Sequence, residues 1–271
     1  MWYNYVNRRP DTSLKFIHEQ NYKTKIEGNY GHIGDKIEKF YTDEYLPLKE
    51  KLLKLDFSNA DDKIFAAFTT YINDYIKKLH SFCVKNGITS QSKLESTFLE
   101  EISIYLFKDM QPIKDGSLGI FNKNVYAGLK IEKGLSINIP KKDVDFCIGK
   151  EVSLGLDEEI AKIIIPIVAV EVKTYLDATM LGEIQYSSRV IRNAVPNAKT
   201  YVLTGYHVVG EDRISSARSD KSIDEIFVLQ EKEGAPIEAE AIKAYFEQIE
   251  SDIKKTTEEN TVSVLGRLLA Q

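Results

Sequence analysis

An apolar run over residues 163–170 constrains the fold of this chain more than any other part of its sequence. A strand with one face in water alternates apolar and polar side chains, but this run is apolar at odd and even positions alike. It therefore predicts a central strand over residues 162–172 that is covered on both faces, with Pro166 at its start or at a bulge. A helix is expected over 178–193 and a strand over 200–204, an order typical of a parallel crossover.

The other predicted elements make this an α/β chain with a mixed central sheet flanked by helices. Apolar residues at steps of three and four, and then short β-prone runs, predict helices over 62–85 and 94–106 and strands over 125–131, 136–139, 144–148 and 226–229. A Ser-, Asp- and Arg-rich stretch before the last strand is predicted to be a loop. We expect three parts: a helical N-terminal region (1–90), a mixed α/β core (91–235) and a helical C-terminal segment (236–271).

Charged side chains follow the apolar run at its carboxyl end. Glu171 and Lys173 are two residues apart, so on a strand both project from the same face. Asp145 belongs to another β-prone run and would lie beside Glu171 if the two strands pair. Carboxylates in an apolar neighbourhood are costly unless they bind a cation, and Mg²⁺ prefers one or two carboxylates completed by water and phosphate oxygens. The three residues therefore predict a magnesium-dependent phosphodiesterase centre.

The acid-x-Lys spacing is not specific by itself, because it also occurs at Asp61-Asp62-Lys63 and Asp252-Ile253-Lys254. Both of these lie in charge-rich stretches predicted to be helical, where residues two apart do not face one another. Glu171 differs because it ends an apolar strand and a strand acid precedes it. An ordinary strand-end ion pair between Glu171 and Lys173 is the alternative interpretation.

The order of Asp145, Glu171 and Lys173 resembles the motif of the PD-(D/E)XK nuclease superfamily, although Val144 stands where that motif has proline. Longer blocks between about residues 92 and 229 are similar to BbvCI-related type II restriction endonucleases. They lie at residues 98–109, 125–129, 142–150 and 171–181. This resemblance implies a PD-(D/E)XK restriction-endonuclease-like sheet and an enzyme that cuts duplex DNA at short, nearly palindromic sites with Mg²⁺.

By the same resemblance, Asp145 and Glu171 would ligate Mg²⁺, while Lys173 would orient or activate the attacking water and stabilise charge on the phosphorane. An ordinary lysine is protonated at neutral pH and is a poor base, so Lys173 would act mainly by its charge. The protein would work as a homodimer or as a heterodimer with a related subunit, with a cognate methyltransferase as its counterpart. Residues 1–90 lie outside this resemblance and are only a candidate DNA-recognition or dimerisation part.

Nuclease sites of this superfamily often include a further carboxylate from a helix that precedes the sheet. Periodicity favours Glu101 as this catalytic and metal-binding residue, because it lies next to the apolar stripe of its predicted helix. Glu100 and Glu95 are the alternatives, and each of the three is also compatible with an ordinary solvated helix position.

Basic residues after the motif are candidates for DNA contacts. Arg189 and Arg192 lie on the helix predicted after Lys173, and Arg213 and Arg218 lie in the predicted polar loop. Arginine contacts guanine bidentately, which favours this loop as the recognition segment, with a merely solvated loop as the alternative. Arg8 and Arg9, together with nearby aromatic residues, form a possible arm onto DNA or an ordinary terminus.

Bulk properties limit the alternatives without deciding among them. The net charge of −5 is unfavourable for DNA binding, but a bound cation and local patches matter more than the total. Two cysteines, no signal-like start and no bilayer-spanning run predict a soluble, cytoplasmic protein without a membrane role. A structure-specific repair or recombination nuclease and a non-cutting DNA-binding partner subunit remain the competing functions.

Overall fold

One long strand, β7 (Glu159–Leu176), organises the fold of the computed structural model, which describes residues 14–28, 33–156 and 159–257. This strand contains the predicted one and extends beyond it at both ends. Pro166 lies inside β7 at a register shift, where Gly149 of the neighbouring strand pairs with Pro166, so the prediction of a bulge is confirmed. Gly149 is required there, because a Cβ atom would lie 2.4 Å from the carbonyl oxygen of Ile165.

The central sheet is mixed, as predicted, and β7 has neighbours along both edges. One edge pairs antiparallel with β6 (Phe146–Leu156), which pairs in turn with β1 (Gly119–Phe121). The other edge pairs parallel with two strands in succession, β2 (Val125–Tyr126) and then β8 (Lys199–His207). Beyond these lie β5 (Lys141–Lys142) next to β2 and β9 (Glu225–Val228) next to β8. The expected mixed sheet and parallel crossover are both confirmed.

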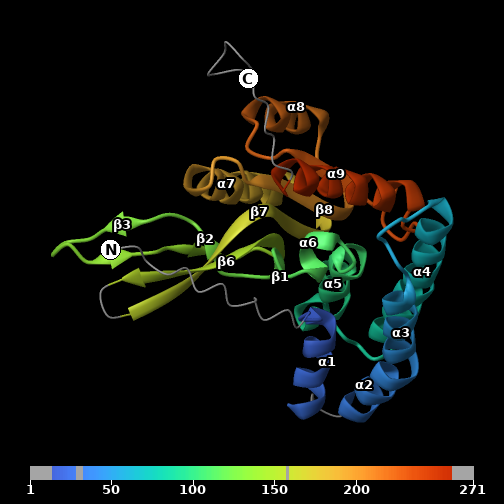
Figure 1. Cartoon of the computed structure of the whole chain (residues 1–271). Helices are drawn as coiled ribbons and strands as arrows, with labels where there is room; N and C mark the ends of the chain where they lie inside the picture. Colours follow the sequence, from blue (N-terminus) through green and yellow to red (C-terminus); the bar gives the residue numbers. More distant parts are fainter. Residues whose placement is uncertain (1–13, 29–32, 157–158, 258–271) are drawn as a thin grey trace.

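Helices cover both faces of this sheet (Figure 1). Val168, Val170 and Val172 of β7 join a core with helices α4, α5 and α9, while Ala169 faces the opposite side, towards α7. The helices are α1 (Ile17–Glu27), α2 (Gly34–Phe40), α3 (Leu46–Lys54), α4 (Asp62–Lys85), α5 (Leu94–Phe107), α6 (Gln111–Lys114), α7 (Ala178–Ala194), α8 (Glu211–Asp220) and α9 (Ala239–Thr257), with a π-helix (Tyr41–Tyr45) and a 3-10 helix (Ser90–Ser92) between them. The prediction that β7 is covered on both sides is therefore confirmed.

Two of the predicted elements differ from the structure. The strand predicted over 125–131 is interrupted, because only Val125–Tyr126 joins the central sheet. Its second part, β3 (Lys130–Ile131), pairs with β4 (Ile137–Asn138) in a separate two-stranded sheet. The predicted polar loop contains helix α8, which buries only Ala217 and therefore has almost no apolar periodicity to detect.

The N-terminal region is helical, as predicted, and it shares one buried core with the sheet and α9. Because this core extends across residues 90 and 235, the division into 1–90, 91–235 and 236–271 stays a prediction. Cys83 and Cys147 are both buried and free. Among the described helices, none combines the length and the apolar character that crossing a bilayer requires.

Candidate active site

Pairing of β6 with β7 brings the predicted acidic residues together. Phe146 pairs with Val170, so Asp145, one residue before β6, lies opposite Glu171 at the same level of the sheet. The Asp145 carboxylate accepts a hydrogen bond of 2.8 Å from the backbone N–H of Val172, which fixes this carboxylate against β7. The expectation that Asp145 and Glu171 become neighbours through strand pairing is thereby confirmed.

Lys173 lies within ion-pair distance of both acids. Its Nζ atom is 3.8 Å from an Asp145 oxygen and 3.6 Å from a Glu171 oxygen. Burial and the neighbouring charge of Asp145 together raise the pKa of Glu171 to about 7, although Lys173 opposes the shift. One lysine therefore does not satisfy two adjacent carboxylates, and an added cation would stabilise the ionised pair.

An open cleft of about 750 Å³ lies between these residues and helix α7. One wall carries Lys142, Asp145, Glu171 and Lys173, and the other wall is formed by α7 residues that include Gly182 and Tyr186. Tyr186 is one of the few large aromatic side chains exposed to solvent in the described part of the chain. The cleft gives an extended, charged ligand access to the two carboxylates.

The donor set in this cleft fits a hard divalent cation. Asp145 and Glu171 supply only carboxylate oxygens, and Mg²⁺ is commonly held by one or two such groups plus water and substrate phosphate oxygens. Within the described residues, no group of three or more His, Cys, Asp or Glu side chains is arranged to hold a metal. The arrangement is therefore not a closed protein cage, and it would leave most coordination positions to water and a phosphate.

Glu101, the predicted third acidic residue, is engaged in a separate network of hydrogen bonds, so its role in the centre stays a prediction that these contacts disfavour. Its side chain is fully buried, and one oxygen accepts hydrogen bonds from the hydroxyls of Tyr45 (2.8 Å) and Tyr105 (2.7 Å). The other oxygen accepts from the backbone N–H groups of His18 (2.9 Å) and Glu19 (3.3 Å). These two N–H groups belong to the first turn of α1, so Glu101 caps the N-terminus of that helix from α5.

Glu100, on the same helix, interacts electrostatically with two residues of the predicted centre, Asp145 and Lys173. Burial and the charge of Asp145 together raise the pKa of Glu100 to about 7, although Lys93, Lys173 and Lys123 oppose the shift. Glu100 and Asp145 also line a common cavity of about 310 Å³. The remaining alternative, Glu95, pairs instead with His80 at an exposed position, at 2.9 Å.

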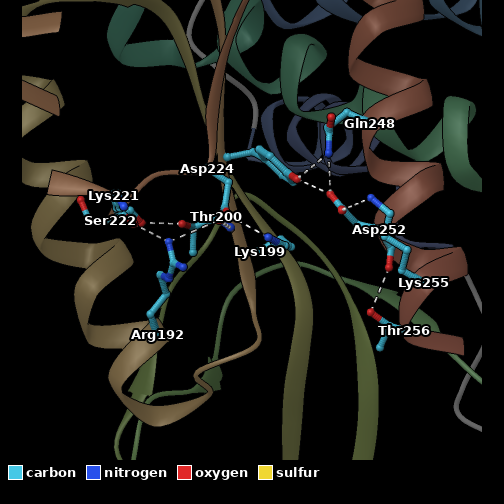
Figure 2. Close-up of polar contacts among 11 residues, drawn as sticks. Arg192, Lys199, Thr200, Lys221, Ser222, Asp224, Gln248, Asp252, Lys255 and Thr256 are labelled. Carbon is cyan, nitrogen blue, oxygen red and sulfur yellow. Dashed lines mark hydrogen bonds and ion pairs between the residues drawn. The ribbon is translucent and has the colours of Figure 1, made fainter. Parts of the chain in front are cut away.

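The helix arginines predicted to contact DNA are held within the chain. Arg189 is 3.5 Å from an oxygen of Asp220. Arg192 donates to the backbone carbonyl oxygen of Lys221 and lies 3.6 Å from Asp224 (Figure 2). Arg192 thereby ties α7 to the segment between α8 and β9.

Arg213 and Arg218 are exposed, but they lie on helix α8 and not in a loop. Arg8 and Arg9 lie outside the described residues.

The two competing acid-x-Lys matches lie in helices, as expected. Asp61 caps α4 by accepting a hydrogen bond of 3.0 Å from the backbone N–H of Ile64. Asp252 is buried in α9 and accepts hydrogen bonds from Tyr201 and Gln248 (Figure 2). Both acids therefore have structural roles.

Sequence reasoning missed the α7 wall of the cleft, Gly182 and Tyr186 in particular. Their spacing of four residues was detectable, but only the pairing of β7 with β8 shows which face of the helix meets the cleft. Lys142, which sequence reasoning gave no role, lies in the same cleft.

Comparisons with known proteins identify the family and the fold of the chain. The sequence model of the Bpu10I restriction endonuclease family matches residues 91–256. The fold is similar to a chain of the solved structure titled "native BbvCI A2B2 tetramer at low resolution". That match has a TM-score of 0.68 and 17% sequence identity, and it covers 89% of this chain and 98% of the other. No match was found among the curated proteins.

Proposed function

The chain belongs to the Bpu10I restriction endonuclease family, whose model matches more than half of it, and on this premise we propose that it is a type II enzyme hydrolysing duplex DNA with Mg²⁺ at a short specific sequence. The observation that carries the proposal is the meeting of Asp145, Glu171 and Lys173 in one open cleft. The family and the restriction-endonuclease-like fold expected from the sequence are confirmed.

We assign metal binding to Asp145 and Glu171 alone. Glu100, which shares a cavity with Asp145, replaces Glu101 as the proposed third acidic residue beside this pair. When bound, Mg²⁺ supplies Lewis-acid stabilisation and a more acidic water. Lys173 holds a positive charge within 4 Å of both carboxylates, where the negative charge of a phosphorane would build up. Asp145 is kept in place by the Val172 N–H group, so the carboxylate does not have to reorganise when a phosphate arrives.

The partners of this enzyme follow from the same premise. A double-strand break needs two centres, so we propose a homodimer or a heterodimer with a related subunit, and a cognate methyltransferase as functional counterpart. The BbvCI structure is titled an A2B2 tetramer, which favours a related second subunit. Arg213 and Arg218 remain proposed DNA contacts, whereas Arg189 and Arg192 would first have to release Asp220 and Asp224. A cytoplasmic location completes the proposal.

Cleavage of plasmid DNA by the purified chain tests the proposal directly. With Mg²⁺ we expect cuts at discrete positions, and a loss of at least about 100-fold in Asp145→Ala and Lys173→Ala, because each removes a charge from the reacting centre. Lys63→Ala is the matched control, since Lys63 belongs to a competing acid-x-Lys match on an exposed helix face. Equal activity in all variants would refute the assignment of the centre, and scattered cuts would refute sequence specificity.

A non-cutting partner subunit is the second candidate, favoured by the heteromeric title of the BbvCI structure. It predicts that the purified chain stays inactive with Mg²⁺ and cuts only after a related subunit is added. In that mixture, Asp145→Ala separates the two possibilities. If this chain contributes a centre, the variant mixture nicks one strand, and if it does not, the mixture still cuts both.

A further inference from the structure

A two-stranded hairpin projects from the catalytic region, away from the helices (Figure 1). We call residues 128–142 the hairpin arm; it contains β3 and β4 and ends in β5. Residues 129–138 are all exposed. An isolated two-stranded hairpin is only marginally stable in water. The exposed hairpin arm is therefore a candidate surface for binding a partner.

The two faces of the arm differ in character. Lys130 pairs with Asn138, and Ile131 pairs with Ile137, so the side chains of each pair share a face. One face is therefore polar and the other apolar. On the polar side, the Asn138 side-chain amide donates a hydrogen bond of 2.6 Å to Glu132, which orients this amide and leaves its second hydrogen and its oxygen available.

The tip of the arm is strained and apolar. Leu135 has a φ of 66°, in the left-handed region that a branched side chain seldom adopts. Its side chain is 83% exposed, and no large apolar side chain in the described part of the chain is more exposed. The positive φ values of Gly134 and Leu135 are those that a tight hairpin turn requires, and this turn presents the leucine side chain to solvent.

The charge of the arm identifies the kind of partner. It carries four lysines, Lys130, Lys133, Lys141 and Lys142, and a single acidic residue, Glu132, in a chain with a net charge of −5. None of the four amino groups forms an ion pair with another described residue. Cations that are free in this way bind phosphates and release counterions, whereas an apolar protein surface does not require them. Charge complementarity therefore favours a polyanion as the occupant.

The position of the arm relates it to the reacting phosphate. Lys141 and Lys142 form β5, and Asp145 follows three residues after Lys142. Asn138 is seven residues from Asp145, so at about 3.3 Å per residue the two are at most about 23 Å apart. Duplex DNA rises about 3.4 Å per base pair. The arm therefore reaches bases within roughly seven pairs of a phosphate held at Asp145.

From these observations, and resting on the proposed function, we propose that the hairpin arm enters a groove of duplex DNA and supplies sequence recognition. A two-stranded ribbon fits the major groove. Lys130 and Asn138 contact base edges there, as lysine pairs with guanine and asparagine with adenine. Lys133 and Lys141 contact phosphates, and Leu135 and the isoleucine face pack against thymine methyl groups and sugars.

Binding without cleavage tests the arm separately from the catalytic centre. The full-length chain carrying Asp145→Asn is titrated with a 30-base-pair fluorescent duplex at several salt concentrations. Lys130→Ala, Lys133→Ala and Lys141→Ala are combined in one variant. A matched control combines Lys54→Ala, Lys77→Ala and Lys85→Ala, which remove the same charge from exposed helix positions. Thermal unfolding of both variants checks that the fold is intact.

We expect the arm variant to reduce the slope of log K against log salt by about 2, because Lys133 and Lys141 each lose a phosphate contact that contributes about 0.9. The control variant should keep the parental slope. Equal slopes in the two variants would overturn the proposal. So would an Ile131→Ser and Ile137→Ser double variant that leaves DNA binding unchanged but alters the oligomeric state, since this would place a protein on the arm.

Specificity provides a second measurement, once plasmid cleavage has identified a site. Lys130→Ala or Asn138→Ala should reduce discrimination at one base pair by about 5- to 150-fold, while cleavage at altered sites persists. Unchanged discrimination in both variants would overturn a role in base recognition. If the chain binds DNA through the arm but never cuts it, the proposed catalytic function fails and the arm proposal stands. If it cuts specifically while the arm variant behaves like the control, the reverse holds.

Discussion

Replacing Glu101 by glutamine should destabilise the fold by about 3 kcal/mol without acting on the catalytic cleft. The carboxylate is fully buried and accepts four hydrogen bonds, two from tyrosine hydroxyls and two from backbone N–H groups of α1. A glutamine amide has only one oxygen, so its NH₂ group must face two of these four donors. Leaving a buried donor unsatisfied costs about 1–3 kcal/mol, and the lost charge also weakens the bonds that remain.

Thermal unfolding of Glu101→Gln measures this effect, with Glu100→Gln as the matched neighbour. For a chain of this size, about 3 kcal/mol corresponds to a fall in Tm of roughly 6–12 °C. Glu100→Gln should keep or slightly raise the Tm, since it removes a charge that burial and Asp145 already disfavour, as the pKa of about 7 indicates. Its plasmid cleavage should fall strongly, because Glu100 is the proposed third acidic residue.

The opposite pattern would refute the assignment of the two glutamates. Suppose that Glu101→Gln keeps its Tm and loses cleavage, whereas Glu100→Gln has a lower Tm and still cleaves. Glu101 would then belong to the centre, as its sequence position first indicated. A Tm that is unchanged in both variants would show that the four hydrogen bonds of Glu101 contribute little to stability.

Two further predictions concern the cleft wall and the N-terminal core. Gly182→Ala should raise the free energy of unfolding by about 1 kcal/mol, because this helix position is open and alanine favours helices. The same variant should cleave more weakly if DNA lies against α7, since the added methyl group enters the cleft. Unchanged cleavage would argue against DNA lying there. Burial lowers the pKa of His18 to about 3, so below about pH 6.5 the unfolded chain binds a proton that the folded chain does not. Stability should therefore fall from pH 6.5 towards pH 4, and urea midpoints of His18→Gln should show a shallower fall than wild type; equal slopes would contradict this.

The sequence was sufficient to predict the central strand and the pair of acids because both depend on local patterns. A run that is apolar on both faces requires two covering layers, and the pairing of two adjacent β-prone runs places Asp145 opposite Glu171. Neither inference needs the rest of the chain. The choice between Glu100 and Glu101 does, because the contacts of Glu101 come from a helix far away in the sequence.

Helix periodicity identifies the face of α5 that is buried, but not what buries it. Almost all of α5 is enclosed, and α1 brings the N–H groups of His18 and Glu19 to Glu101 from more than 80 residues away. A buried carboxylate can be satisfied by a helix N-terminus as well as by a metal, and the two possibilities look identical in sequence. For α8 the difficulty was the opposite, since a helix with one buried alanine has no apolar pattern.

Net charge was a poor guide to DNA binding in this chain because its cations differ in how they are paired. Arg189 and Arg192 are each close to an aspartate and would have to exchange partners to contact phosphate. The arm lysines have no such partner among the described residues, so their charge is available without any exchange. The free energy of counterion release depends on the cations that reach phosphates, not on the total of −5. The acidic balance of the chain is thus compatible with tight DNA binding, provided that the arm carries the contact.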